Sequence, residues 1–249
     1  MDLYYEVHGE GTPIVLLHSG GEDLRDWHAI APQLSRTNKV VTFDGRGVGR
    51  SPAVLEPINY IEDFRAFLDF LGIDTAVLVG HSMGGQVATD FALTYPARVS
   101  RLVLISPGLT GFQFSPEYEQ HTMQVMAAAP DVKKMVNISL DFPSYRVTMA
   151  SSQRDLLYEM QKLHMQRILE WKTYQIDWPQ PPAVEQLDQL RAKTLFILGT
   201  EDIPDLFRVA ETCKQIPDIR FAYIEGADHM PTLTHPDEVF RLITQFLHE

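Results

Sequence analysis

The chain has 249 residues, of which 45% are hydrophobic and 22% are charged, a composition that excludes a disordered polypeptide. Its 21 Lys and Arg against 33 Asp and Glu give a net charge of −12, which argues against nucleic acid or an anionic membrane as the main partner. A single cysteine, Cys213, excludes an internal disulfide framework and fits a reducing compartment. No basic leader and no apolar run of about 20 residues is present, so we expect a cytoplasmic protein.

Strand-like and helix-like segments alternate along most of the chain. Short apolar runs predict strands at residues 3–7, 13–17, 39–43, 76–79, 102–105, 194–198 and 220–224. Apolar residues at helical spacing predict helices at residues 64–71, 84–95, 206–216 and 236–247. This alternation predicts an α/β fold in which helices cover both faces of a mostly parallel central sheet.

One long segment departs from the alternation. Residues 108–186 contain no convincing strand, and their helix-like stretches are interrupted by prolines. Six of the nine methionines lie in this segment. We therefore expect a helical cap, or lid, over residues 108–186, inserted into a core domain formed by residues 1–107 and 187–249.

The strongest chemical signal is a Gly-x-Ser-x-Gly motif between a predicted strand and a predicted helix. Gly80 and Gly84 flank Ser82, and their lack of side chains permits a sharp turn that lifts the serine hydroxyl clear of the sheet. The same turn directs the backbone N–H of Met83 and the helix N-terminus toward the group that the serine attacks. The motif predicts Ser82 as a nucleophile and Met83 as one oxyanion donor.

A serine nucleophile needs a base, and the base needs an acid to orient it. In this strand–helix context the acid and the base follow the serine in that order, each in a loop after a later strand. The predicted strand at residues 194–198 leads to Asp202, and the strand at residues 220–224 leads to His229. We expect these two residues to be the acid and the base, with Asp205 and Glu201 as weaker candidates for the acid.

The loop after residues 13–17 is the expected source of the second oxyanion donor. It contains two consecutive glycines, which allow the backbone to approach a substrate closely, and the Gly20 N–H is the candidate. Three residues near the motifs are expected to contact substrate: Trp27, His81 and Met230.

With these motifs in place, the sequence resembles the α/β-hydrolase superfamily over nearly its whole length. The resemblance is carried by residues 16–20, 44–51, 80–85, 199–202 and 226–229. It implies a Ser82–Asp202–His229 triad, an oxyanion donor at Gly20, a structural role for Arg46 and no cofactor. Two departures stand out: Ser19 replaces a usual glycine, and the chain starts at what looks like the second strand of the family.

The residues exclude some reactions and leave others open. The serine separates the chain from related epoxide hydrolases and haloalkane dehalogenases, which carry an aspartate there, and no metal-binding or nucleotide-binding motif is complete. We expect a serine hydrolase for esters, lactones or related acyl compounds that are small and mainly apolar, because the insertion is rich in Met and aromatic residues. A carbon–carbon bond hydrolase and a slow or non-catalytic small-ligand receptor remain alternatives.

Overall fold

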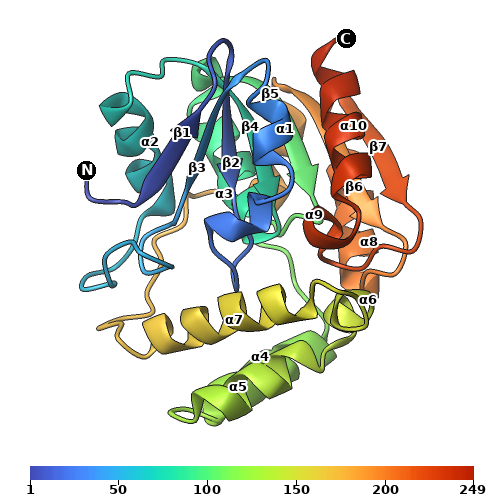
Figure 1. The fold of residues 1–249 in the computed structure, drawn as a ribbon. Helices are drawn as coiled ribbons and strands as arrows, with labels where there is room; N and C mark the ends of the chain where they lie inside the picture. Colours follow the sequence, from blue (N-terminus) through green and yellow to red (C-terminus); the bar gives the residue numbers. More distant parts are fainter.

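The computed structural model describes residues 1–249 and contains one seven-stranded sheet (Figure 1). The strands are β1 (Tyr5–His8), β2 (Pro13–Leu17), β3 (Lys39–Phe43), β4 (Ala76–His81), β5 (Val99–Ile105), β6 (Lys193–Gly199) and β7 (Ile219–Ile224). They lie in the order β1-β3-β2-β4-β5-β6-β7, and only β1 is antiparallel to its neighbour. The predicted α/β fold with a mostly parallel sheet is confirmed.

Helices cover both faces of the sheet. One face carries α2 (Tyr60–Phe70), α3 (Met83–Thr94) and α8 (Pro204–Cys213), and the other carries the short helices η1 (Leu24–Trp27) and α1 (Ala31–Leu34) together with α10 (Pro236–Leu247). Period-two alternation assigns side chains to the two faces: Val15 and Leu17 pack into the first core, and Ile14 and Leu16 into the second. The sheet is therefore buried on both sides, as its apolar strands predict.

The segment between β5 and β6 forms a separate helical layer. It contains α4 (Pro116–Ala127), α5 (Val132–Leu140), α6 (Arg146–Met149) and α7 (Arg154–Ile168), and its only β-type pairing is an isolated bridge between Ile58 and Ile176. Figure 1 shows α7 crossing below the sheet, with α4 and α5 lying below it. The helices share a small core that includes Met135 and Met160 and receives Met230 from the sheet domain.

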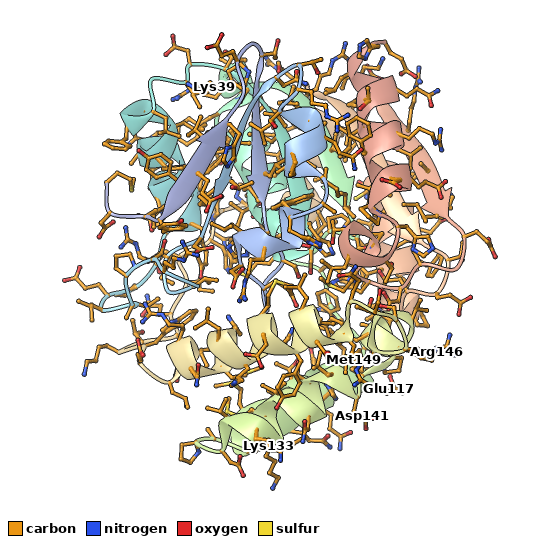
Figure 2. The ribbon with its side chains drawn as sticks, viewed as in Figure 1. Lys39, Glu117, Lys133, Asp141, Arg146 and Met149 are labelled. Carbon is orange, nitrogen blue, oxygen red and sulfur yellow. The ribbon has the colours of Figure 1, made fainter.

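Charged side chains of this layer face outward. Glu117, Lys133, Asp141 and Arg146 are all exposed, and Figure 2 shows them on the helical layer below the sheet, far from Lys39 at the opposite end of the molecule. These four charged side chains therefore lie on the outer surface of the layer. None of the helices is both long enough and apolar enough to span a bilayer.

The structure also contains short elements that the sequence patterns did not predict. They include η1, α1 and α9 (Pro231–Thr234), each of four residues. A four-residue helix is too short to display a helical repeat of apolar residues, so periodicity gives no signal for it. The strand predicted at residues 76–79 extends to His81, because the buried backbone continues in the sheet up to the turn.

Candidate active site

A sharp turn between β4 and α3 exposes one serine. Ser82 alone separates the two elements and has φ 51° and ψ −113°, in a region that non-glycine residues seldom adopt. A Cβ on Gly80 would lie 2.4 Å from the carbonyl oxygen of Gly84, and a Cβ on Gly84 would lie 2.2 Å from that of Leu17. Both positions therefore require glycine, and the packing that excludes side chains there holds Ser82 in its strained conformation.

Ser82 begins a chain of hydrogen bonds that ends at a buried carboxylate. Its hydroxyl lies 2.9 Å from Nε2 of His229, whose Nδ1 lies 3.0 Å from Oδ2 of Asp202. Because a carboxylate only accepts, Nδ1 carries the proton and Nε2 is free to accept from the serine. The other oxygen of Asp202 accepts from the backbone N–H of Ile203 at 2.8 Å, and the carboxylate is inaccessible to solvent. The structure thus brings together the three residues that the sequence analysis expected to form a triad.

The other two acidic candidates point elsewhere. Asp205 accepts from the backbone N–H and the hydroxyl of Ser115, both at 2.8 Å, and pairs with Arg208. Glu201 pairs with Arg146 at the surface. Neither carboxylate contacts His229.

Two residues that line the cavity beside Ser82 have backbone N–H groups without an acceptor in the protein. Met83 is the first residue of α3, so its N–H has no acceptor within the helix. Gly20 packs against Met83, since a Cβ on Gly20 would lie 3.2 Å from the Met83 Cβ, and its N–H donates to no protein carbonyl. Both residues line the same cavity as Ser82. The geometry is that of a pair of donors available to an oxyanion.

The three residues expected to contact substrate do not line this cavity, and that expectation is corrected. Trp27, His81 and Met230 are all fully buried. Trp27 packs under the sheet, and Met230 joins the core of the helical layer. His81 ends β4, where the strand directs its side chain into the protein while the turn directs Ser82 out of it.

His81 instead forms a buried pair with Asp26. Its Nδ1 lies 2.8 Å from Oδ2 of Asp26, and its Nε2 lies 2.7 Å from the carbonyl oxygen of His229. Burial alone would lower the pKa of His81, but the Asp26 carboxylate outweighs this effect and raises the pKa to about 9. In turn, the charge and hydrogen bond of His81 outweigh the burial of Asp26 and hold the pKa of that carboxyl below its usual value. No local sequence signal links two residues that are 55 positions apart.

The cavity beside Ser82 has a volume of about 420 Å³ and contains no Lys, Arg, Asp or Glu in its wall. Aromatic and aliphatic residues of the helical layer form much of it: Phe114, Tyr118, Val125, Met126, Phe142, Tyr145, Met165 and Ile168. A second cavity of about 220 Å³ adjoins it across Gly20 and Met83, and the only charged residues in its wall, Arg46 and Asp63, pair with each other at 2.6 Å.

Two histidines of the helical layer, His121 and His164, add polar groups to the cavity wall, and no sequence pattern predicted this. Burial lowers the pKa of His164, which lines both cavities, to about 4, and burial also lowers the pKa of His121. Both rings are therefore neutral at pH 7. No three His, Cys, Asp or Glu side chains lie close enough together to hold a metal ion.

The helical layer is fixed to the loop that carries His229. The backbone N–H of His229 donates to the carbonyl of Ser144 at 3.0 Å. Asp228 accepts from both the backbone N–H and the hydroxyl of Thr148, each at 2.7 Å. A third link joins Gln161 to the buried Glu22 at 2.8 Å, next to the Gly20 loop. The layer is thereby attached both to the loop of His229 and to the loop that carries Gly20.

Comparison with known proteins identifies the family. A family model described as the alpha/beta hydrolase fold matches residues 12–236. The chain belongs to the α/β-hydrolase family. The sequence-based predictions of this fold and of a hydrolase are both confirmed.

Relatives within the α/β-hydrolase family carry out several reactions. The chain is 28% identical over 257 residues to a 2-hydroxy-6-oxononadienedioate/2-hydroxy-6-oxononatrienedioate hydrolase of Comamonas testosteroni, covering 96% of this chain and 88% of that protein. It is 26% identical to a pimeloyl-[acyl-carrier protein] methyl ester esterase of Legionella pneumophila (strain Lens), covering 99% and 100%. Among solved structures, Est816, described as an N-acyl homoserine lactone degrading enzyme, has a TM-score of 0.78 at 27% identity, covering 98% of this chain and 96% of its own.

Proposed function

We propose that this α/β-hydrolase cleaves small, uncharged and mainly apolar carboxylic esters or lactones through an acyl-enzyme on Ser82. The observation that carries the proposal is the hydrogen-bonded chain from Ser82 through His229 to Asp202, which opens into a cavity without charged side chains. A serine hydroxyl is a weak nucleophile, and an adjacent oriented imidazole is the group that activates it.

The geometry supports a two-step reaction. The Ser82 oxygen attacks the carbonyl carbon while its proton passes to Nε2 of His229, and Asp202 stabilises the resulting imidazolium. The carbonyl oxygen becomes an oxyanion and accepts hydrogen bonds from the Gly20 and Met83 N–H groups. The tetrahedral intermediate expels the alcohol, which takes the proton from His229. Water then attacks the acyl-enzyme by the same sequence, releasing the carboxylic acid and restoring Ser82.

The walls of the cavity support an uncharged substrate. Burial of an unpaired carboxylate is unfavourable by several kcal/mol, and no cationic side chain in the 420 Å³ cavity is available to pair with one. The neutral His121 and His164 offer hydrogen bonds without charge. The hydrolase of Comamonas testosteroni is named for dioate substrates, which would need such a cation. We therefore favour ester or lactone hydrolysis over carbon–carbon bond hydrolysis.

Residues 108–186 form the cap in this proposal, over a core domain of residues 1–107 and 187–249. The support is the contact of α7 and the α4–α5 pair with the cavity, and the bonds of Ser144 and Thr148 to the His229 loop. Apolar side chains of the insertion share the cavity wall with Ser82, which supports a role for the cap in binding the acyl group of the substrate.

A series of p-nitrophenyl esters tests the substrate class. Burial of each added methylene contributes about 0.8 kcal/mol of binding free energy. The kcat/KM should therefore rise about fourfold per methylene, from acetyl upward, until the cavity is full. An ester of equal length with a terminal carboxylate should react on the order of 10²-fold more slowly than its methyl-terminated match. Steady-state kinetics at pH 7.5 provides the measurement.

The same panel separates the alternatives. Faster turnover of carboxylate-bearing dienoic ketones than of neutral esters would favour a carbon–carbon bond hydrolase and contradict the proposal. A single turnover followed by a stalled enzyme, on every ester and lactone tested, would favour a ligand receptor.

A further inference from the structure

The two ring nitrogens of His81 both face oxygen acceptors. Nδ1 faces the Asp26 carboxylate at 2.8 Å, and Nε2 faces the His229 carbonyl at 2.7 Å. Since neither oxygen donates, satisfaction of both contacts requires a proton on each nitrogen. His81 is therefore a buried imidazolium, directly before Ser82 in the chain and with its ring centroid 5.4 Å from that of His229.

Asp26 connects this imidazolium to two further segments. Its Oδ2 also accepts from the backbone N–H of Ser19 at 3.2 Å, and its Oδ1 accepts from the hydroxyl of Thr232 at 2.6 Å. Ser19 precedes Gly20, and Thr232 is the second residue of α9, three positions after His229. One buried pair thus touches the loop of the expected oxyanion donor, the turn of the nucleophile and the loop of the base.

We propose that the His81–Asp26 pair is a positioning element that sets the spacing between Ser82, His229 and the Gly20 N–H. This inference rests on the proposed hydrolase function. Three of its links are one residue or less from a reacting group: His81 is bonded covalently to Ser82, its acceptor is the carbonyl of His229 itself, and Ser19 adjoins Gly20. The fourth, Thr232, is three residues after His229.

A purely stabilising role is a weaker explanation of the pair. Buried ion pairs are frequently replaceable by apolar residues without loss of stability, because desolvation offsets their attraction. Alignment is more sensitive, since a displacement of about 1 Å in an active site lowers the rate on the order of 10²-fold. A pair that joins three reacting segments controls such displacements directly.

Loss of the proton from His81 should break the arrangement. The charged and titratable groups around the ring are Asp26 from η1, Glu22 from the same loop region and His229 from the β7–α9 loop. The pKa of His81 is about 9, so the ring loses a proton above that pH. The nitrogen that loses it then directs a lone pair at an oxygen, either of the Asp26 carboxylate or of the His229 carbonyl, and the two repel each other. The kcat of the wild-type enzyme should therefore fall reversibly above about pH 9.

The raised pKa of His81 also makes the stability of the fold depend on pH. The pKa of His81 in the folded protein, about 9, is above its ordinary value of 6.5, so its contribution to stability is complete below pH 6.5. That contribution is lost as the pH rises through about 9. The Tm should fall over this interval.

Two substitutions at position 81 separate the two links. The amide of His81→Asn can reach Asp26 but not the His229 carbonyl, and the longer amide of His81→Gln can reach the carbonyl but not Asp26. Both variants should lose kcat on the order of 10²-fold, with KM changed by less than about threefold. Both should also lose the fall in activity near pH 9, because neither side chain titrates there. Asp26→Asn should lower kcat to a similar degree.

Controls distinguish misalignment from general weakening. His28→Asn removes an exposed histidine at the end of η1, and Thr194→Val removes a buried hydroxyl at the far end of β6. Each should leave kcat and its fall above about pH 9 (the alkaline limb) unchanged, even if Thr194→Val lowers the Tm. Nuclear magnetic resonance of the wild-type protein at pH 8 should show two N–H protons on one buried histidine ring, a result that needs no variant to fold.

The possible outcomes are distinct. If the wild type hydrolyses esters but both His81 variants keep its kcat and its alkaline limb, the positioning role is wrong and the proposed function stands. A neutral His81 ring at pH 8 would overturn the inference as well. If the wild type hydrolyses no ester or lactone, the proposed function itself fails.

Discussion

Ser82→Ala should lower kcat by about 10⁴- to 10⁶-fold while the protein stays folded. The substitution removes the only hydroxyl within hydrogen-bonding distance of Nε2 of His229 and leaves the Gly20 and Met83 N–H groups in place. Alanine fits the backbone conformation of residue 82 about as well as serine does, so the circular dichroism spectrum and the Tm should change little. Steady-state kinetics on the best ester of the panel measures the effect.

Ser106→Ala is the matched control for this substitution. Ser106 also has a positive φ, 43°, and follows the neighbouring strand β5, but its buried hydroxyl has no hydrogen-bond partner. Its replacement should change kcat by less than about threefold, since a surface or core change away from the reacting groups acts mainly on stability. Near wild-type turnover by Ser82→Ala would show that another residue is the nucleophile.

Asp202→Asn should lower kcat about 10⁴-fold. The Asn amide can donate to Nδ1 of His229, which moves the ring proton to Nε2 and prevents that atom from accepting the Ser82 proton. Because Asp202 is buried and replaced by a side chain of equal size, the fold should survive. The loss should appear in kcat far more than in KM.

Asp205→Asn, in the first turn of α8 three residues further along, supplies the comparison. Its carboxylate accepts hydrogen bonds from Ser115 and forms an ion pair with Arg208, and it does not contact His229. Its replacement should therefore change kcat by only a few-fold. A larger loss for Asp205→Asn than for Asp202→Asn would transfer the acid role to Asp205.

The positions of the three triad candidates after their strands could be predicted from the sequence. Ser82 follows β4 directly, Asp202 and His229 lie in the loops after β6 and β7, and the carboxyl ends of parallel strands meet at one edge of the sheet. The glycines at 80 and 84 carried a similar local signal, because close backbone contacts leave no room for a Cβ. Local patterns therefore predicted three residues that the fold brings together, although they did not give the distances between them.

The interior contacts of the site were not predictable in the same way. His81 and Asp26 meet because β4 and η1 pack together, and nothing in either local segment indicates a partner 55 residues away. Its position next to the nucleophile suggests that His81 contacts substrate, whereas the geometry of β4 directs its side chain inward. The lining of the cavity likewise depends on how α4, α5 and α7 pack, which helical periodicity does not determine.

Detection of the acyl-enzyme tests the central claim most directly. Wild-type protein mixed with a p-nitrophenyl ester and quenched in acid within milliseconds should gain the mass of one acyl group, and peptide mapping should locate that group on Ser82. An active-site phosphonate should label the same residue, and Ser82→Ala should gain neither mass. Turnover without any acylated species, or acylation of a different residue, would contradict the account.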